Sequence, residues 1–224
     1  MGDAGLQTWA LLRLMAWLSP AFPIGGFAWS GGLERAVHDG MAGDAGGLRS
    51  WLEALLLHGS LWNDAVLFAE AWRRHDDEAA LADVAELGLA LAGSAERHFE
   101  TLSMGQAFVT AARAWPSDLF DRLPRELPLP VAVGAVSAAH DVPLTEGLAA
   151  YLHAALSQSV SAGIRLGACG QAEGVAILAA LEAAVVDVSS RASECGPDDL
   201  GTAAIRAEIA SLRHETQNSR LFRS

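Results

Sequence analysis

Residues 51–72 read WLEALLLHGSLWNDAVLFAEAW, and the spacing of their apolar side chains decides the fold class. Apolar residues recur there three, four or seven positions apart, at Trp51, Leu55, Trp62, Ala65, Ala69 and Trp72. Because a helix has 3.6 residues per turn, this spacing places them all on one face. The pattern predicts one amphipathic helix across the stretch.

The helical period continues along the rest of the chain. Acidic residues at 76–78 begin the next helix, and Ser94 is the expected N-cap of a third, which Pro116 stops. Later helices are expected at 131–140, 143–165, 167–190 and 203–217. In the last of these, the expected apolar stripe consists of Ile205, Ile209 and Leu212.

Strand signals are missing from the sequence. No run alternates apolar and polar residues as a half-buried strand does, and alanine, the best helix former, is abundant. No linker divides the 224 residues, a length that suits one large domain. The sequence therefore predicts an all-α, single-domain bundle of about 8–10 helices over residues 1–224, with a flexible N-terminus at about 1–8.

The amino-acid composition excludes several classes of protein and of functional site. Hydrophobic residues make up 51% of the chain and charged residues 19%, which excludes a disordered protein. The formal net charge of −12 repels phosphate, so we expect no nucleic-acid partner. All fifteen cations are arginine, which excludes a Schiff-base lysine and a P-loop lysine.

The chain is apolar enough to raise the question of a membrane, with a mean hydropathy of +0.24. Its longest uncharged run, residues 147–164, is about the minimum length for crossing a bilayer. That run contains His153, Gln158 and three serines, which favours a buried helix. Residues 1–10 carry an acid and no cationic segment, and two cysteines make no disulfide framework. We therefore expect a cytoplasmic protein with no membrane partner.

The sequence matches none of the common catalytic or metal-binding motifs. The seven histidines never pair at helical spacing, so no helix face presents two metal ligands. His214-Glu215 begins a zinc-protease signature, but Asn218 stands where its second histidine belongs. No Gly-x-Ser-x-Gly elbow is present, and the glycines after residue 166 have the wrong spacing for a dinucleotide site. We assign no catalytic, cofactor or metal residue.

The stretch Ser19–Glu34, SPAFPIGGFAWSGGLE, is unusual for a loop. Two prolines forbid a helix and two Gly-Gly pairs permit positive φ angles, yet four large apolar residues lie between them. A solvated linker would not carry them. The loop either fills the core or offers a binding surface, and the residues do not decide between these alternatives.

The C-terminal stretch Arg213–Ser224, RHETQNSRLFRS, is equally unusual. It holds three arginines and one glutamate in an otherwise acidic chain, and it sets Leu221 and Phe222 between two arginines. Such a tail is either packed on its own domain, disordered, or a docking segment that orders on binding a partner. In a docking segment, Leu221 and Phe222 would supply buried area, and Arg220 and Arg223 would supply forked hydrogen bonds.

Both stretches resemble those of the urease accessory protein F (UreF) family. Residues 19–34 match its Ser-Pro-x-x-Pro-x-Gly-Gly-[Phe/Tyr]-x-[Tyr/Trp]-Ser-x-Gly-Leu-Glu pattern almost throughout, and the tail from His214 is close to a family signature. Residues 96–104 are loosely similar to its Arg-Glu-Thr segment. Arg165 with Gly170-Gln171 resembles its Arg-Leu-x-Pro-[Leu/Phe]-Gly-Gln helix start, but Gly167-Ala168-Cys169 replaces the proline and the large residue.

The resemblance implies an all-α homodimer without enzymatic activity, which acts in loading nickel into urease. It implies binding to the D-type (H-type) accessory protein, then to the G-type GTPase, and docking of that complex on urease apoprotein. In the family the tail orders when the D-type partner binds. The implied partner-binding residues are Pro23, Gly25, Gly26, Phe27, Trp29, Ser30, Glu34, Arg165, Gln171, His214, Glu215, Arg220, Leu221, Phe222 and Arg223.

Two roles toward the GTPase are open. An arginine of this chain could be inserted to activate hydrolysis, or Glu34 and its loop could bias the GTPase conformation. We favour the second, because D-type docking already explains both tail arginines. Two other classes of function compete with the adaptor: a helical metal-binding protein or metalloenzyme that uses the scattered histidines and carboxylates, and a membrane-associated helical protein.

Overall fold

The computed structural model describes residues 3–224, and every regular element in that part of the chain is a helix. The α-helices are α1 (Asp3–Trp17), α2 (Leu33–His38), α3 (Ala45–His58), α4 (Ser60–Arg73), α5 (Glu78–Ala90), α6 (Ala95–Ala112), α7 (Leu129–Ala139), α8 (Leu144–Arg165), α9 (Gln171–Ala192) and α10 (Ile205–His214). Short 3-10 helices lie at Gly26–Ala28, Asp118–Asp121 and Pro197–Asp199. The all-α prediction and the expected range of helix number are confirmed.

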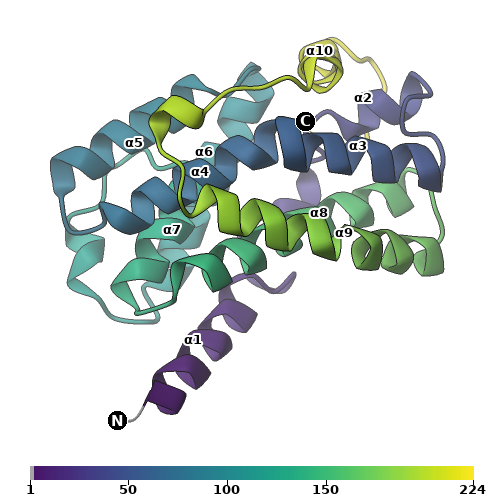
Figure 1. The fold of residues 1–224 in the computed structure, drawn as a ribbon. Helices are drawn as coiled ribbons and strands as arrows, with labels where there is room; N and C mark the ends of the chain where they lie inside the picture. Colours follow the sequence, from purple (N-terminus) through teal and green to yellow (C-terminus); the bar gives the residue numbers. More distant parts are fainter. Residues whose placement is uncertain (1–2) are drawn as a thin grey trace.

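Helix α4 lies at the centre of the bundle (Figure 1). Every residue from Leu61 to Ala71 is buried, because α3, α7, α8 and α9 all pack around this helix. Helix α7 is buried just as completely, from Pro130 to Ala138. Apolar residues of all these helices join one continuous core, as expected for a single folded unit.

The single helix predicted for residues 51–72 is wrong, because the stretch forms two helices that meet at Gly59. The segment that precedes α10 crosses at this point. A Cβ atom on Gly59 would lie 2.9 Å from the Cβ of Ala204, so only glycine fits. The carbonyl of His58 accepts hydrogen bonds from the backbone amides of Ala203 (2.7 Å) and Ala204 (3.2 Å). A tertiary contact therefore ends a helix that the apolar period alone would continue.

The predicted helix starts near residues 77 and 94 are confirmed by side-chain caps. The Asp77 carboxylate accepts from the amide of Ala80 at 3.0 Å, at the start of α5. The Ser94 hydroxyl accepts from the amide of Arg97 at 3.1 Å, at the start of α6. These bonds satisfy amides that the helix itself leaves without partners.

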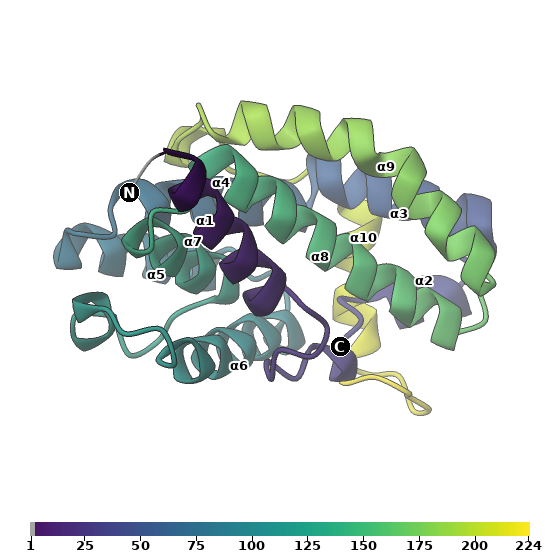
Figure 2. The same cartoon turned by 90° about the horizontal axis from the view of Figure 1, so that it is seen from below.

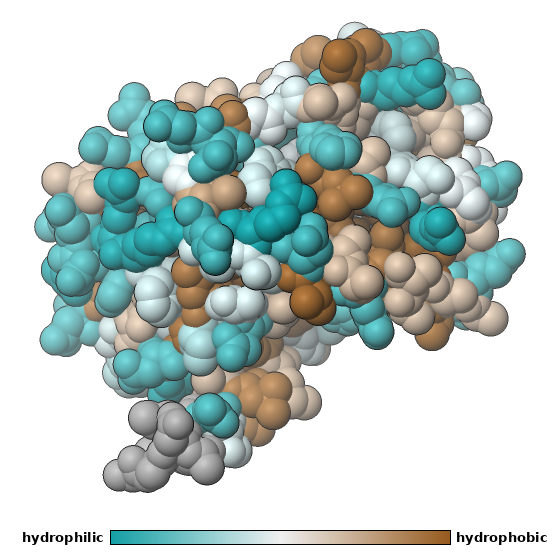
Figure 3. Space-filling model, in the orientation of Figure 1, coloured by the Kyte–Doolittle hydropathy of each residue, from teal (hydrophilic) through white to brown (hydrophobic). Residues whose placement is uncertain are grey.

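Helix α10 faces the opposite way from the sequence prediction. Its large apolar residues Ile205, Ile209 and Leu212 are 66%, 48% and 49% exposed, while the small Ala207 and Ala210 are buried. The cause is close packing on α2: a Cβ on Gly32, whose φ is +82°, would lie 2.9 Å from the amide nitrogen of Ser211. Only small side chains fit between helices so close together. Figure 3 shows apolar side chains over α10, where this stripe (the α10 stripe) reaches the surface.

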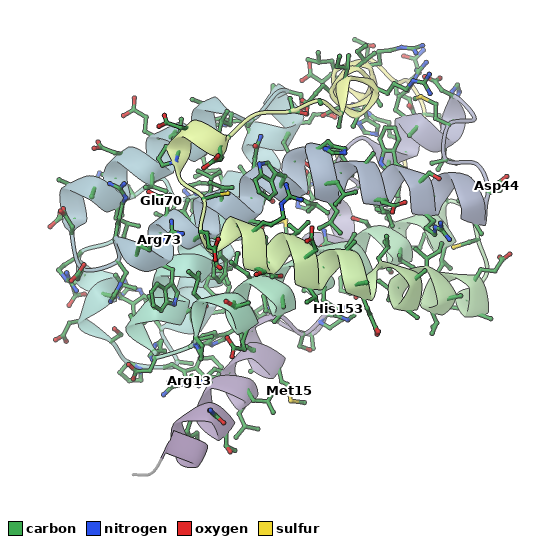
Figure 4. The ribbon with its side chains drawn as sticks, viewed as in Figure 1. Arg13, Met15, Asp44, Glu70, Arg73 and His153 are labelled. Atoms are coloured by element: carbon green, nitrogen blue, oxygen red, sulfur yellow. The ribbon has the colours of Figure 1, made fainter. Side chains whose placement is uncertain are left out.

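Helix α1 projects from the bundle (Figure 1). Trp17 anchors its end in the core, and the guanidinium of Arg13 donates to the carbonyl of His140 at 2.6 Å. Figure 4 shows Met15 pointing away from the bundle, where it is 64% exposed. Of the segment expected to be flexible, residues 1 and 2 lie outside the described residues, and α1 covers the rest.

The long uncharged run at 147–164 forms most of α8. One side of this helix is buried against its neighbours through Tyr151, Leu152 and Leu156. Across residues 3–224, the structure contains no helix with the length and apolar character needed to cross a membrane.

Candidate partner-docking site

The loop between α1 and α2 is partly buried and partly exposed. Phe22 packs on Phe108 with ring centroids 5.6 Å apart, and Trp29 is buried, so part of the loop fills the core. Phe27 is 55% exposed, and Pro23 and Gly25 are also exposed. The loop therefore has a buried anchor and an exposed edge.

The C-terminal tail folds back onto this loop (Figure 2). The amide of Arg223 donates to the carbonyl of Ala28 at 2.8 Å, and the amide of Ser30 donates to the carbonyl of Ser224 at 3.0 Å. The hydroxyl of Ser30 also bonds to that carbonyl. Phe222 and Ser224 are buried, whereas Leu221 is 55% exposed. The two unusual stretches of the sequence thus form one surface.

Glu34 joins the loop to the tail. One carboxylate oxygen accepts from the amide of Leu221 at 2.7 Å, and the other accepts from the amide of Phe222 at 2.9 Å. A ring nitrogen of His214 lies 3.2 Å from that second oxygen. Glu34 is itself buried, so it holds the tail rather than facing solvent.

Glu96, at the start of α6, holds the tail from the other side. Its carboxylate pairs with the guanidinium of Arg220 at 2.5 Å and with the second ring nitrogen of His214 at 2.6 Å. The fully buried ring of His214 therefore lies between two carboxylates, Glu34 and Glu96. Glu215 accepts from the amide of Ala95 at 2.8 Å, at the positive end of the α6 dipole.

Arg165, at the end of α8, reaches both stretches. Its guanidinium carbon lies 4.3 Å from the centre of the Phe222 ring, and one of its nitrogens donates to the carbonyl of Phe27 at 2.6 Å. Nearby on α8, the amide of Gln158 donates to the carbonyl of Gly26 at 3.0 Å. Gln171 is exposed at the start of α9, and the described contacts join it to neither the loop nor the tail.

A buried charged cluster lies beneath the tail, and sequence analysis missed it. Arg97 pairs with Asp64 at 2.9 Å and with Glu100 at 3.3 Å, and the Tyr151 hydroxyl donates to Asp64 at 3.0 Å. The hydroxyl of Ser224 donates to Glu100 at 3.0 Å, so the end of the tail touches this cluster. The one signal in the sequence was the loosely matched segment 96–104, which contains both Arg97 and Glu100.

The electrostatics of the cluster follow from its burial. Burial raises the pKa of Glu100 above its ordinary value, although the charge of Arg97 and the Ser224 hydroxyl act in the opposite direction. Burial also raises the pKa of Tyr151, and the neighbouring Asp64 carboxylate adds to the effect. Arg97 remains charged, because the attraction of two carboxylates outweighs the cost of its burial.

A surface hollow of about 450 Å³ opens where the loop, the tail and α6 meet. Its floor is aromatic, since Trp29 and the half-exposed Phe99 meet edge to face with centroids 5.7 Å apart. Arg220 and Arg223 stand at its rim, and the Arg223 guanidinium carbon lies 5.8 Å from the centre of the Trp29 ring. The full lining is Trp29, Ala95, Glu96, Phe99, Arg220, Phe222 and Arg223. Such a hollow suits an apolar side chain beside a carboxylate.

The arrangement is suited to recognition. Aromatic rings and arginines are the residue types that most often carry binding energy at protein interfaces. Across residues 3–224, no three histidine, cysteine, aspartate or glutamate side chains are grouped so as to hold a metal ion. The fold and this surface together define an all-helical protein with an exposed surface rich in aromatic rings and arginines.

Comparison with known proteins identifies the family. The UreF family model matches residues 42–182. The urease accessory protein UreF of Agrobacterium fabrum is 62% identical over 215 residues, covering 96% of each chain. That of Rhizobium etli (strain CIAT 652) is 59% identical over 223 residues, covering 100% of this chain and 99% of its own. Urease accessory protein UreF 1 of Brucella canis is 54% identical over 217 residues, covering 97% and 95%.

The chain belongs to the UreF family of urease accessory proteins. The resemblance seen in the sequence is thereby confirmed. Members of this family take part in urease maturation as accessory proteins and are not enzymes.

Proposed function

We propose that this chain is a non-enzymatic adaptor that bridges the D/H-type accessory protein and the G-type GTPase on urease apoprotein. In that role it supports GTP-dependent nickel insertion in the cytoplasm, and it acts as a homodimer. The implied partner-binding residues support this proposal, because most of them meet at one surface, formed by the loop, the tail and the start of α6. The observation that carries it is the docked tail, whose buried Phe222 fixes an exposed Leu221 between two arginines.

The exposed α10 stripe is a second candidate for the partner contact. Ile205, Ile209 and Leu212 are all about half exposed or more, and the tail begins directly after α10. An exposed apolar stripe of this kind is typical of a protein interface. We assign the stripe and the tail to the D/H-type accessory protein.

The substitution Ile209→Asp tests this assignment. We expect it to reduce capture by the D/H-type accessory protein at least tenfold, because it places a charge in the apolar centre of the contact (about 1.4 kcal/mol per tenfold). The melting temperature should change little, since Ile209 is 48% exposed in the free chain. The measurement is a titration of purified proteins. Val186→Asp, at a 66% exposed position on α9, is the matched control and should leave binding intact. Equal binding by both variants would remove the stripe from the interface.

The role toward the GTPase is tested by Glu34→Ala. Arg220 is paired with Glu96 at 2.5 Å, which supports a fixed surface rather than an arginine inserted into the GTPase. We therefore expect Glu34→Ala to abolish most of the effect of this chain on GTP turnover by the G-type partner, because it frees the tail. Arg223→Ala should retain that effect. If Arg223→Ala alone abolished the effect of this chain on GTP turnover, the inserted arginine would be favoured. If Glu34→Ala left that effect unchanged, Glu34 would have no role toward the GTPase.

The assembly itself is tested by co-expression with the D/H-type and G-type proteins. Size-exclusion chromatography with mass measurement should give a complex that contains all three proteins and two copies of this chain. A complex of the other two proteins that forms equally well without this chain would overturn the bridging role. Stoichiometric, tightly bound metal in the purified chain alone would instead favour the metal-binding alternative.

A further inference from the structure

Helix α1 is fixed to the bundle by a group of aromatic rings around Trp17. The Trp17 ring meets Phe108 and Trp115 edge to face, with centroids 6.4 Å and 5.7 Å apart. His140, which ends α7, lies against the same ring, with centroids 5.4 Å apart and planes tilted by 51°. Trp17 and His140 are both buried, so their contact lies out of water. We call these four residues the Trp17 cluster.

The hydrogen bonds of His140 suit a neutral ring. The backbone of Trp115 accepts a hydrogen bond from the ring, whereas Nε2 is buried and has no hydrogen-bond partner among the described residues. The bond to Trp115 therefore uses Nδ1, which holds the single proton of a neutral imidazole. The unprotonated Nε2 is then an acceptor and adds no donor to this dry contact.

A charged ring would not fit the Trp17 cluster. The second proton would lie on Nε2, where it would be a buried donor without an acceptor. The indole nitrogen of Trp17 is itself a buried donor with no partner in residues 3–224, so it cannot accept that proton. The guanidinium of Arg13 already donates to the carbonyl of His140 at 2.6 Å, so a positive charge is present beside the ring. Burial and like charge therefore both disfavour protonation.

The surroundings of His140 set the direction of its titration. Burial lowers the pKa of His140 below its ordinary value of about 6.5, and the charge of Arg13 acts in the same direction. The backbone of Trp115 and the Asp141 carboxylate act in the opposite direction without cancelling the effect. A histidine whose pKa is lower in the folded state stabilises that state above about pH 6.5. This stabilisation is lost as the pH falls below that value.

The Trp17 cluster also contacts the start of the loop between α1 and α2. The ring of Phe22 packs on Phe108 and Trp115, with centroids 5.6 Å and 6.3 Å away. Two backbone amides report on this region: that of Leu18 bonds back to α1 at 3.0 Å, and that of Phe22 bonds within the loop at 2.9 Å. The end of α1 and the start of the loop therefore rest on the same rings.

We propose that His140 is an acid-sensitive switch for the end of α1: its neutral ring holds α1 and the start of the loop on the bundle, and its protonation loosens them. The helical body around α4 keeps its structure in both states. The switch uses residues of this chain alone, so it stands or falls independently of the proposed adaptor function.

The first test is a pH titration of the histidine rings of the full chain by NMR. The ring of His140 should titrate at a lower pH than the exposed ring of His58. Arg13→Gln removes the neighbouring charge and should move the midpoint of His140 upward. A midpoint of His140 above that of His58 would overturn the switch, because stacking on Trp17 would then stabilise the charged ring.

The second test is amide hydrogen exchange at about pH 7.5 and about pH 5, expressed as protection relative to an unstructured chain. Protection at the amides of Leu18 and Phe22 should fall at least about threefold at the lower pH, while amides in α4 keep theirs. His140→Gln has a side chain that cannot be charged, so this pH dependence should disappear. His58→Gln, at an exposed position at the end of α3, is the matched control and should retain it.

Three results of the exchange experiment would contradict the switch. Equal protection of Leu18 and Phe22 at both pH values would show that acid does not loosen the end of α1. The same loss in His140→Gln would assign the effect to another group. An equal loss in α4 would indicate general unfolding by acid. If His140→Gln does not fold, the ring titration of the wild type and of Arg13→Gln decides the question.

Discussion

Deleting residues 218–224 is expected to abolish capture of the chain by the D/H-type accessory protein, while the helical body stays folded. The deletion removes Leu221, both arginines at the rim of the hollow, and the ring of Phe222. Loss of the buried Phe222 destabilises the fold by about 1.5–3 kcal/mol. For a chain of this size, that lowers the melting temperature by roughly 3–12 °C. Circular dichroism should still show a helical protein.

The measurement is a pull-down with equal amounts of truncated and full-length chain. The matched control is the double substitution Asn218→Ala and Ser219→Ala, because both side chains are exposed in the tail. This double variant should still be captured by the D/H-type accessory protein. A second control reverses the order of residues 218–224, which keeps charge and composition, and should lose capture. Full capture of the truncated chain would exclude the tail from the interface, whatever its packing in the free protein.

The helical elements were predictable wherever local chemistry decides them. The cap at Asp77 and the cap at Ser94 follow from neighbouring residues, so the starts of α5 and α6 were predicted from the sequence. The break at Gly59 was not, because it depends on Ala203 and Ala204, more than a hundred residues later. The orientation of α10 was also missed, since it is decided by close packing on Gly32 rather than by its own apolar period.

The candidate site was predictable as two motifs but not as one surface. The apolar loop and the tail each stand out from their composition, yet no local pattern indicates that Glu34 meets the amides of Leu221 and Phe222. Arg97 and Glu100 resemble an exposed helical ion pair in the sequence. Their burial becomes evident only when Asp64 of α4 lies opposite them. Long-range contacts of this kind leave no periodic signal in either segment.

Replacing Arg97 by methionine is expected to destabilise the protein more than any surface change. Arg97 pairs with both Asp64 and Glu100, and all three side chains lie largely out of water. Removing the cation leaves two buried carboxylates that repel each other, which costs about 3–5 kcal/mol. The melting temperature should fall by roughly 6–20 °C. Arg49→Met, at an exposed position on α3, is the matched control and should change it little.

The pH dependence of the stability of the Arg97→Met variant distinguishes the loss of the Arg97 charge from the loss of its packing. Burial already raises the pKa of Glu100, and removing Arg97 removes the charge that opposed this rise. A carboxyl whose pKa is higher in the folded state binds its proton more readily when folded, so acid stabilises the folded state. The free energy of unfolding of the variant is lower than that of the wild type, and this deficit should therefore become smaller as the pH falls from about 8 to about 5. Adding Asp64→Asn and Glu100→Gln should recover part of the stability at neutral pH. A deficit that is constant with pH and unchanged by the added substitutions would mean that Arg97 contributes through packing alone.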